Sequence, residues 1–110
     1  MKLPNFQNAV IDEAKLREYC LNPQHPRGKH KARMFRSAIG LTAKDAPRLH
    51  QLILEGIAMF EAEIGEADEY GQRYTVDIDV VAQKGIVRIR SGWIIRTSED
   101  FPRLTTSYVL

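Results

Sequence analysis

Basic side chains gather in one short segment of the chain, between residues 25 and 31. Five of these seven positions are basic: His25, Arg27, Lys29, His30 and Lys31. Pro26 and Gly28 interrupt the run, and a helical pattern begins directly after it. The first amide groups of a helix lack partners within the helix, so positive charge and free donors coincide here. That combination suits an anionic group such as phosphate, whereas the plainer interpretation is a solvated basic surface.

Helical geometry sorts these basic residues by direction. In a regular helix that starts at Gly28, Lys31 lies about 50° from the apolar face, while His30 and Lys29 lie more than roughly 100° away. Lys31 is therefore expected at the rim of the core. Either its stem packs there with the amine in water, or its ammonium meets phosphate or transfers a proton at the edge of a cleft. Histidine titrates near neutral pH, which makes His30 the obvious acid–base candidate, although it points to solvent unless the first turn is irregular.

A second group of charged residues lies on strands predicted for the C-terminal half. Apolar and polar residues alternate over residues 74–80 and again from residue 87, which is typical of strands buried on one face. Three arginines share the polar face of the second strand, beside two aspartates of the first: Arg88, Arg90 and Arg96, with Asp77 and Asp79. The plainer interpretation is cross-strand salt bridges on a solvated face. The functional interpretation is an arginine surface that binds a polyanion.

A two-residue turn at Lys84-Gly85 predicts the register of this hairpin. It places Asp79 opposite Arg90. In this register Arg96 and, on the next strand, Arg103 have no acidic residue opposite them. These two arginines are therefore the ones most readily left for an anion.

Hydroxyl side chains crowd the last predicted strand, residues 103–110. Thr106 and Tyr108 project to one face of it, and Thr105 and Ser107 project to the other. Such residues are common in strands. They are also the neutral donors that phosphate recognition uses.

The elements that must position these residues fall into two halves. Helical spacing predicts helices over about residues 12–21, 28–39 and 45–64, the last ended by Gly65. Strands follow from residue 70, with a bulge at residues 91–92 and a short extra strand at residues 9–11 as further options. We predict an α+β fold in one domain, residues 1–110, with N-terminal helices packed on one face of a C-terminal antiparallel sheet of three to four strands.

Composition narrows the class of protein. The chain has 110 residues, 44% of them hydrophobic and 27% charged, with a net charge of +2, which permits a nucleic-acid partner without demanding one. The single cysteine excludes an internal disulfide framework. No apolar run approaches the roughly 20 residues that span a bilayer, and the N-terminal residues lack the long apolar core of a secretion signal, so we expect a cytoplasmic protein without membrane contact. His25 and His30 lack the neighbours of a metal site, and no cofactor motif is present.

Several stretches of the chain together resemble a known family. They are MKLPNFQNAVIDEAKLREYCLNP, HPRGKHKARMF, DEYGQRY and FPRLTTSYVL, in that order. They resemble an uncharacterised bacterial domain of unknown function, found often in cyanobacteria and environmental bacteria. The resemblance covers essentially the whole chain. It implies a toxin-like protein of a toxin–antitoxin pair, with a small antitoxin protein encoded nearby as partner.

More distantly, the layout resembles the barnase–EndoU–colicin–RelE superfamily of metal-independent ribonucleases. Those enzymes take a Lys or His from the helical part, an Arg from a central strand and a Ser/Thr-x-Tyr ending from the last strand. The resemblance implies five catalytic residues here: Lys31, His30, Arg96, Thr106 and Tyr108. Further basic residues are expected to bind RNA phosphates: Arg27, Lys29, Arg90 and Arg103. The chain departs from the pattern because His30 is not a well-placed general base.

Two functions follow from these observations. The first is a ribonuclease toxin that cleaves RNA by attack of the 2′-OH on the adjacent phosphate, with no cofactor. The alternative is a non-catalytic nucleic-acid- or protein-binding module of a small bacterial operon. The ribonuclease hypothesis expects the Lys31 amine and the Arg96 guanidinium to converge on one phosphate.

Overall fold

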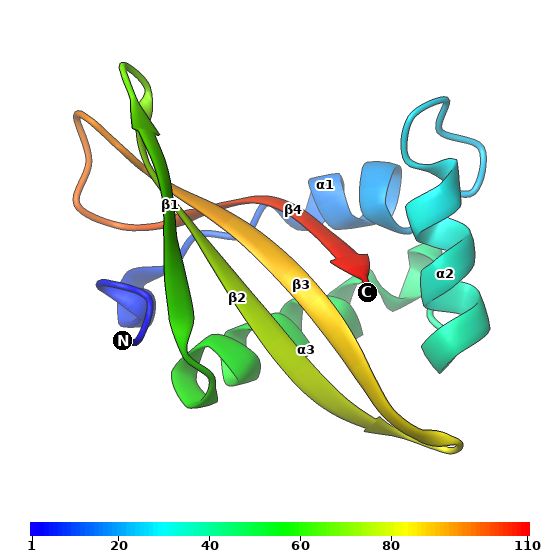
Figure 1. The fold of residues 1–110 in the computed structure, drawn as a ribbon. Helices are drawn as coiled ribbons and strands as arrows, with labels where there is room; N and C mark the ends of the chain where they lie inside the picture. Colours follow the sequence, from blue (N-terminus) through cyan, green and yellow to red (C-terminus); the bar gives the residue numbers. More distant parts are fainter.

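A four-stranded antiparallel sheet follows a series of helices along the chain, which confirms the predicted α+β class (Figure 1). The computed structural model describes all residues, 1–110. The helical elements are η1 (Phe6–Asn8), α1 (Glu13–Lys15), η2 (Leu16–Cys20), α2 (Lys29–Ile39), η3 (Ala43–Asp45) and α3 (Ala46–Met59). The strands are β1 (Ala62–Asp68), β2 (Gly71–Ala82), β3 (Gly85–Arg96) and β4 (Arg103–Val109), in the spatial order β1-β2-β3-β4. None of the helices is both long and apolar enough to span a bilayer.

The first two predicted helices are present, and the first has an unexpected form. Asp12 caps it, with its carboxylate accepting from the Ala14 amide at 3.0 Å. After one α-helical turn, η2 continues as a π-helix, in which the Leu21 amide donates to the Leu16 carbonyl at 2.9 Å. The second helix, α2, ends at Gly40, whose φ of 70° is the left-handed conformation expected of a C-cap glycine.

The third helix is shorter than its periodicity predicts. It ends at Met59, and Phe60 already has extended backbone angles. Residues assigned to the helix form β1, in which Ala62 pairs with Val76. Ile64 continued the helical spacing in the sequence, yet it lies 65% exposed on this edge strand. Pairing with β2 therefore overrides the local helical pattern, and Gly65 marks an irregularity in β1 rather than a helix end.

The hairpin of β2 and β3 has a different register from the predicted one. Its turn consists of residues 83–84, because Ala82 pairs with Gly85, which has a φ of 130°. Asp79 therefore lies opposite Arg88 rather than Arg90. The error is a shift of two residues, so every side chain keeps its predicted face.

The remaining strand predictions hold with small changes. β4 occupies residues 103–109, and the irregularity expected near residues 91–92 lies in its pairing with β3, between Gly92 and Trp93. There, Thr105 of β4 is the extra residue, because Gly92 pairs with Thr106 and Trp93 with Leu104. The short strand expected at residues 9–11 is a single parallel bridge between Val10 and Arg103.

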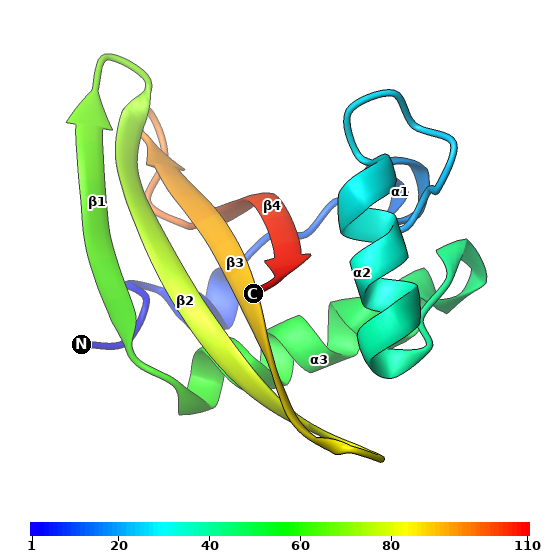
Figure 2. The same ribbon diagram turned by 45° about the vertical axis from the view of Figure 1, so that its right-hand side comes forward.

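The core lies between α3 and one face of the sheet, as Figure 2 shows. Buried residues of α3, with Phe35 of α2, pack against residues of the three strands β2, β3 and β4: Leu49, Ile53 and Ile57 against Val76, Ile78, Ile89, Trp93 and Leu104. We call this the inner face of the sheet. The opposite, outer face bears the alternate residues, among them Asp77, Asp79, Arg88, Arg90, Thr106 and Tyr108.

Gly56 is the point at which α3 crosses closest to β2. A Cβ atom built there would lie 2.5 Å from Cγ2 of Ile78. We expect Gly56→Ala to destabilise the protein by about 1–3 kcal/mol, because overpacking outweighs the roughly 1 kcal/mol gained in helix propensity. Urea unfolding followed by circular dichroism measures the change. In an Ile78→Ala background the same substitution should cost less, because the atoms that a Cβ at position 56 would meet are Cγ1, Cγ2 and Cδ1 of Ile78. A fully stable Gly56→Ala protein would contradict this packing.

Two paired serines in the core differ in their hydrogen bonding. Ser91 Oγ donates to the Val76 carbonyl at 2.8 Å and accepts from Trp93 Nε1 at 2.9 Å. Ser107, opposite it on β4, is equally buried and its hydroxyl has no partner. We expect Ser91→Ala to cost about 1–3 kcal/mol, because it leaves the buried indole N–H unpaired. Ser107→Ala should leave stability unchanged or raise it, because it removes a buried hydroxyl that makes no hydrogen bond. Unfolding free energies of the two variants test this, and equal losses would refute it.

Candidate active site

Lys31 connects three parts of the chain at the edge of the sheet. Its ammonium donates to the hydroxyl of Tyr19 at 3.2 Å and to that of Thr106 at 3.2 Å. The same nitrogen lies 5.0 Å from the ring centroid of Tyr19 and 5.3 Å from that of Tyr108. Tyr19 belongs to η2, Lys31 to the first turn of α2, and Thr106 and Tyr108 to β4. We call these four residues the Lys31 cluster.

The structure thus brings together three of the five residues expected to be catalytic, which are Lys31, Thr106 and Tyr108. In Figure 2, α2 stands beside the end of β4, which explains how a helix residue reaches the outer face of the sheet. Lys31 lies half-buried at the rim of the core, in the direction that a regular helix from Gly28 predicts. Its ammonium is not simply in water, because two hydroxyl groups and two aromatic rings surround it.

The loop of basic residues is folded tightly against Tyr19. Nδ1 of His25 accepts hydrogen bonds from the amides of Arg27 and Gly28, both at 3.0 Å. The His25 ring stacks on the Tyr19 ring at 4.8 Å, with 13° between the planes. Because Nδ1 accepts, the ring carries its proton on Nε2. A Cβ atom at Gly28 would lie 2.4 Å from the Tyr19 carbonyl oxygen, so only glycine permits this approach.

Tyr19 and His25 have roles in the geometry of the site that the sequence did not reveal. Tyr19 matched the apolar spacing of the first helix, which indicates packing rather than a polar contact. His25 was grouped with the basic residues, whereas it accepts backbone hydrogen bonds and orders the loop. The close spacing of a histidine, a proline and a glycine was the available signal for a specific turn.

Arg90 lies beside the Lys31 cluster, because on β3 it is opposite Tyr108 of β4 on one side and Asp77 of β2 on the other. Its guanidinium binds the Asp77 carboxylate through two hydrogen bonds, of 2.8 and 3.0 Å. These bonds lower the pKa of Asp77 below its usual range. Asp77 in turn raises the pKa of Arg90, and Tyr108 adds to this effect. Arg90 is therefore a fixed positive charge beside the cluster.

Arg96 does not meet Lys31, so the expected convergence is wrong. It lies at the far end of β3, opposite Gly71. Thr106 of the cluster pairs with Gly92 on this strand. Arg96 is four residues further along β3, and an extended chain of that length spans about 13 Å. The Nε of Arg96 lies 4.0 Å from a carboxylate oxygen of Glu99. The error of two residues in the predicted register is not the reason that Arg96 fails to meet Lys31. That error changes only which residue of β2 lies opposite Arg96.

Arg103 is also paired, contrary to expectation. Its guanidinium makes two hydrogen bonds of 2.8 Å to Glu99, which follows β3 in the connecting loop. Arg103 lowers the pKa of Glu99 through these bonds. The acidic partner was missed because the prediction considered only residues opposite Arg103 in the sheet.

The other expected phosphate-binding residues remain at the surface around the cluster. His30 and Arg27 are exposed, and Lys29 is half-buried. On the outer face of the sheet, Asp79 pairs with Arg88 at 2.8 Å. The salt bridges that the plainer interpretation predicted are therefore present, although their partners differ.

The contacts of Lys31 define what the cluster can bind. No carboxylate lies within ion-pair distance of this ammonium, whereas the nearby Arg90 has one. An ammonium has three N–H donors, and two of them are used by the hydroxyls of Tyr19 and Thr106. Both hydroxyls accept from Lys31, so their own protons remain available to donate. Gly92, opposite Thr106, places no side chain on the outer face next to them. This arrangement suits an anion with several oxygen atoms.

The single cysteine lies directly beneath the cluster. Cys20 is fully buried, and burial is the main reason that the pKa of its thiol is raised. A hydrogen bond with the backbone of Ser107 opposes this shift. The thiol therefore packs against the backbone of β4 at Ser107, the residue between Thr106 and Tyr108.

Comparison with known proteins identifies the family of the chain. The chain matches the family described as Domain of unknown function (DUF6883) over residues 2–110. It therefore belongs to that family. No curated protein and no solved structure matches the chain.

The Asp77–Arg90 pair should make stability depend on acid pH. Arg90 holds the pKa of Asp77 below its ordinary value of 3.8, so the pair stabilises the fold above that pH and loses this effect as pH falls. We expect the variant Asp77→Asn/Arg90→Gln to lose stability less steeply than the wild type below about pH 4. Urea unfolding over a pH series measures the slopes. Glu63→Gln, at an exposed carboxylate on β1, should keep the wild-type slope. Identical slopes for all three proteins would contradict the assignment.

Proposed function

We propose that the Lys31 cluster binds an RNA phosphate and that the protein is a metal-independent ribonuclease. The observation that carries the proposal is the ammonium of Lys31, held by the hydroxyls of Tyr19 and Thr106 with no carboxylate beside it. Thr106 lies 75 positions away along the chain, so the contact exists only in the folded protein. Charged donors aimed at one point in a partly buried site are what stabilises the charge of a phosphoryl transition state.

The chemistry would need only the chain, the substrate and water. The 2′-oxygen of the RNA attacks the adjacent phosphorus, and the P–O5′ bond breaks to give a 2′,3′-cyclic phosphate and a 5′-hydroxyl. Water accepts the proton of the 2′-OH, and Lys31 donates a proton to the leaving 5′-oxygen before solvent restores it. Arg90 and the hydroxyls of Thr106 and Tyr108 stabilise the charge on the phosphate oxygens.

This assignment replaces two of the residues implied by the resemblance to ribonucleases. Arg90 takes the part expected of Arg96, because Arg90 on β3 pairs with Tyr108 on β4. No part is given to His30, which is exposed on the first turn of α2. The surrounding basic residues Arg27 and Lys29 would bind neighbouring phosphates and make binding sensitive to salt.

The test is cleavage of a defined single-stranded RNA by the purified protein in EDTA. We expect products ending in a 2′,3′-cyclic phosphate, and no cleavage of a substrate with a 2′-deoxy sugar at the cut position. Lys31→Ala should reduce the rate by about 100-fold or more, as loss of a donor to a developing oxyanion does. Tyr108→Phe and Arg90→Lys should each reduce it by a smaller factor.

Arg96→Ala is the matched control, since it removes one arginine from the same strand without touching the cluster. It should leave the rate unchanged, and circular dichroism should show that every variant is folded. Equal losses in Lys31→Ala and Arg96→Ala would refute the assignment. Salt-sensitive RNA binding without product would instead support the second candidate, a non-catalytic binding module that uses the same unpaired ammonium.

A further inference from the structure

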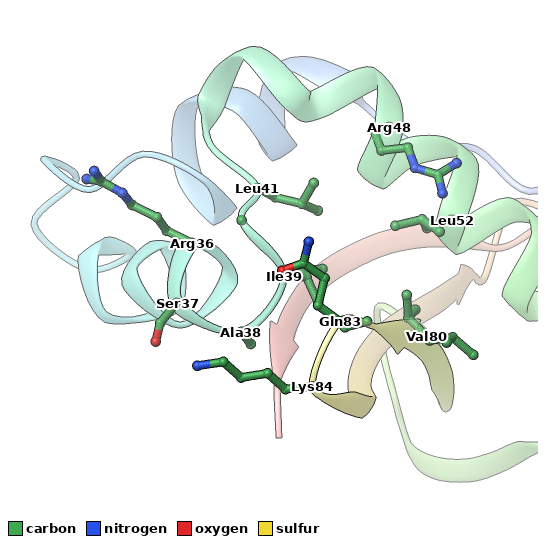
Figure 3. Close-up of a pocket in the computed structure, with 13 residues that line it drawn as sticks. Arg36, Ser37, Ala38, Ile39, Leu41, Arg48, Leu52, Val80, Gln83 and Lys84 are labelled. Carbon is green, nitrogen blue, oxygen red and sulfur yellow. The ribbon is translucent and has the colours of Figure 1, made fainter.

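A concave surface away from the Lys31 cluster lies between the C-terminal half of α2, α3 and the hairpin of β2 and β3 (Figure 3). It encloses about 630 Å³. Its floor is apolar, built from Ile39, Leu41, Leu52 and Val80. None of its lining residues belongs to the Lys31 cluster, so a role for this surface is independent of the proposed ribonuclease activity.

This hollow continues along the edge of β2. A second hollow of about 290 Å³ shares Arg48, Leu52, Val80 and Val81 with the first. It runs past Met59 and Phe60 at the end of α3. We call the two hollows together the hairpin groove.

The strand edge along the hairpin groove has no neighbour. The first pair of β1 with β2 joins Ala62 to Val76, so the part of β2 after Val76 has no strand beside it on that side. An unpaired edge presents backbone donors and acceptors that can bind a further extended chain. The groove therefore offers backbone hydrogen bonds as well as an apolar floor.

Large apolar side chains are exposed at the tip of the same hairpin. Val81 and Ile86 form a cross-strand pair on the outer face of the hairpin tip, with 86% and 70% of their surfaces exposed. Met59, which lines the groove, is 69% exposed. In Figure 1 the hairpin projects beyond α3, so this apolar surface is uncovered. Clustered exposed apolar residues mark interaction surfaces in water-soluble folds.

The charge of the groove is uneven along its length. Arg48 from α3 and Lys84 from the hairpin turn approach the first hollow from different sides, while the guanidinium of Arg36 points away from the floor (Figure 3). No carboxylate lines this hollow, and neither Arg48 nor Lys84 has an acidic partner. Glu55 and Asp79 line only the second hollow, and Asp79 is bound to Arg88. Negative charge on an occupant is therefore favoured beside Arg48 and Lys84.

We propose that the hairpin groove binds an extended segment of a partner polypeptide, with apolar side chains on the floor and carboxylates beside Arg48 and Lys84. A polypeptide fits because the groove combines a free strand edge with an apolar floor. A single-stranded nucleic acid fits poorly, since no aromatic residue lines the first hollow to stack on a base. The segment adds a strand to β2 and leaves the outer face of the sheet, with the Lys31 cluster, open.

The probe for this proposal is a fluorescein-labelled peptide in which a valine-rich stretch is followed by glutamates, so that apolar and acidic side chains can meet different parts of the groove. Its twin has lysine at every glutamate position. Fluorescence anisotropy with the full chain should show at least about tenfold tighter binding of the acidic peptide, weakening as salt rises. A third peptide, N-methylated at alternate amides, should bind poorly because it cannot pair with a strand edge.

Charge reversal locates the binding site. Arg48→Glu/Lys84→Glu should weaken binding of the acidic peptide by about tenfold. Arg48 lies in the first turn of α3, where a glutamate is favourable to the helix, so the variant should fold. Arg17→Glu/Arg33→Glu changes the net charge equally at exposed positions outside the groove, and should bind as the wild type does.

Three results would each overturn the proposal. The first is no binding of the acidic peptide, or equal binding of the acidic and basic peptides. The second is equal weakening by the two double variants, which would indicate attraction to net charge alone. The third is displacement of the peptide by single-stranded RNA, which would assign the groove to a nucleic acid.

Discussion

The Lys31 cluster depends on a single close approach, that of the Tyr19 backbone to Gly28. A side chain at position 28 would collide with the Tyr19 carbonyl, so the loop and the start of α2 could not lie on η2. The same approach lets His25 stack on Tyr19 and accept the amides of the turn. Only with α2 in this place does Lys31 reach both Tyr19 and Thr106. One missing Cβ atom thus positions an ammonium that is 75 positions from its partner on β4.

The ammonium of Lys31 differs from the arginines of the outer face, because each of those arginines has an acidic residue nearby. Arg73, Arg88, Arg90 and Arg103 each bind an acidic residue, and Arg96 lies near the same glutamate as Arg103. These pairs are half-exposed and contribute little to stability individually. They do hold the guanidinium groups in place, and each carboxylate offsets part of the positive charge beside it. Lys31 stands apart because hydroxyls and aromatic rings surround it in place of a carboxylate.

Local patterns predicted the elements better than the contacts between them. The α+β class, α2 with its glycine cap and the faces of β2, β3 and β4 follow from spacing alone. The end of α3 was wrong because Ile64 fits a helical period as well as an edge strand, and only pairing with β2 decides between them. Helical direction placed Lys31 correctly, and alternation placed Thr106 and Tyr108 on one face. Alternation could not tell whether Arg90 or Arg96 lies beside the cluster, because both are on the outer face of β3. Their positions along β3 relative to β4 decide it.

The buried thiol beneath β4 gives the protein an internal reporter. Cys20 is the single cysteine of the chain, and it contacts the backbone of Ser107 between the two β4 residues of the cluster. A reagent can reach this sulfur only when the packing around it opens, because the thiol is fully buried in the core. The rate of alkylation therefore reports how often the core beneath the Lys31 cluster opens, with no substrate present.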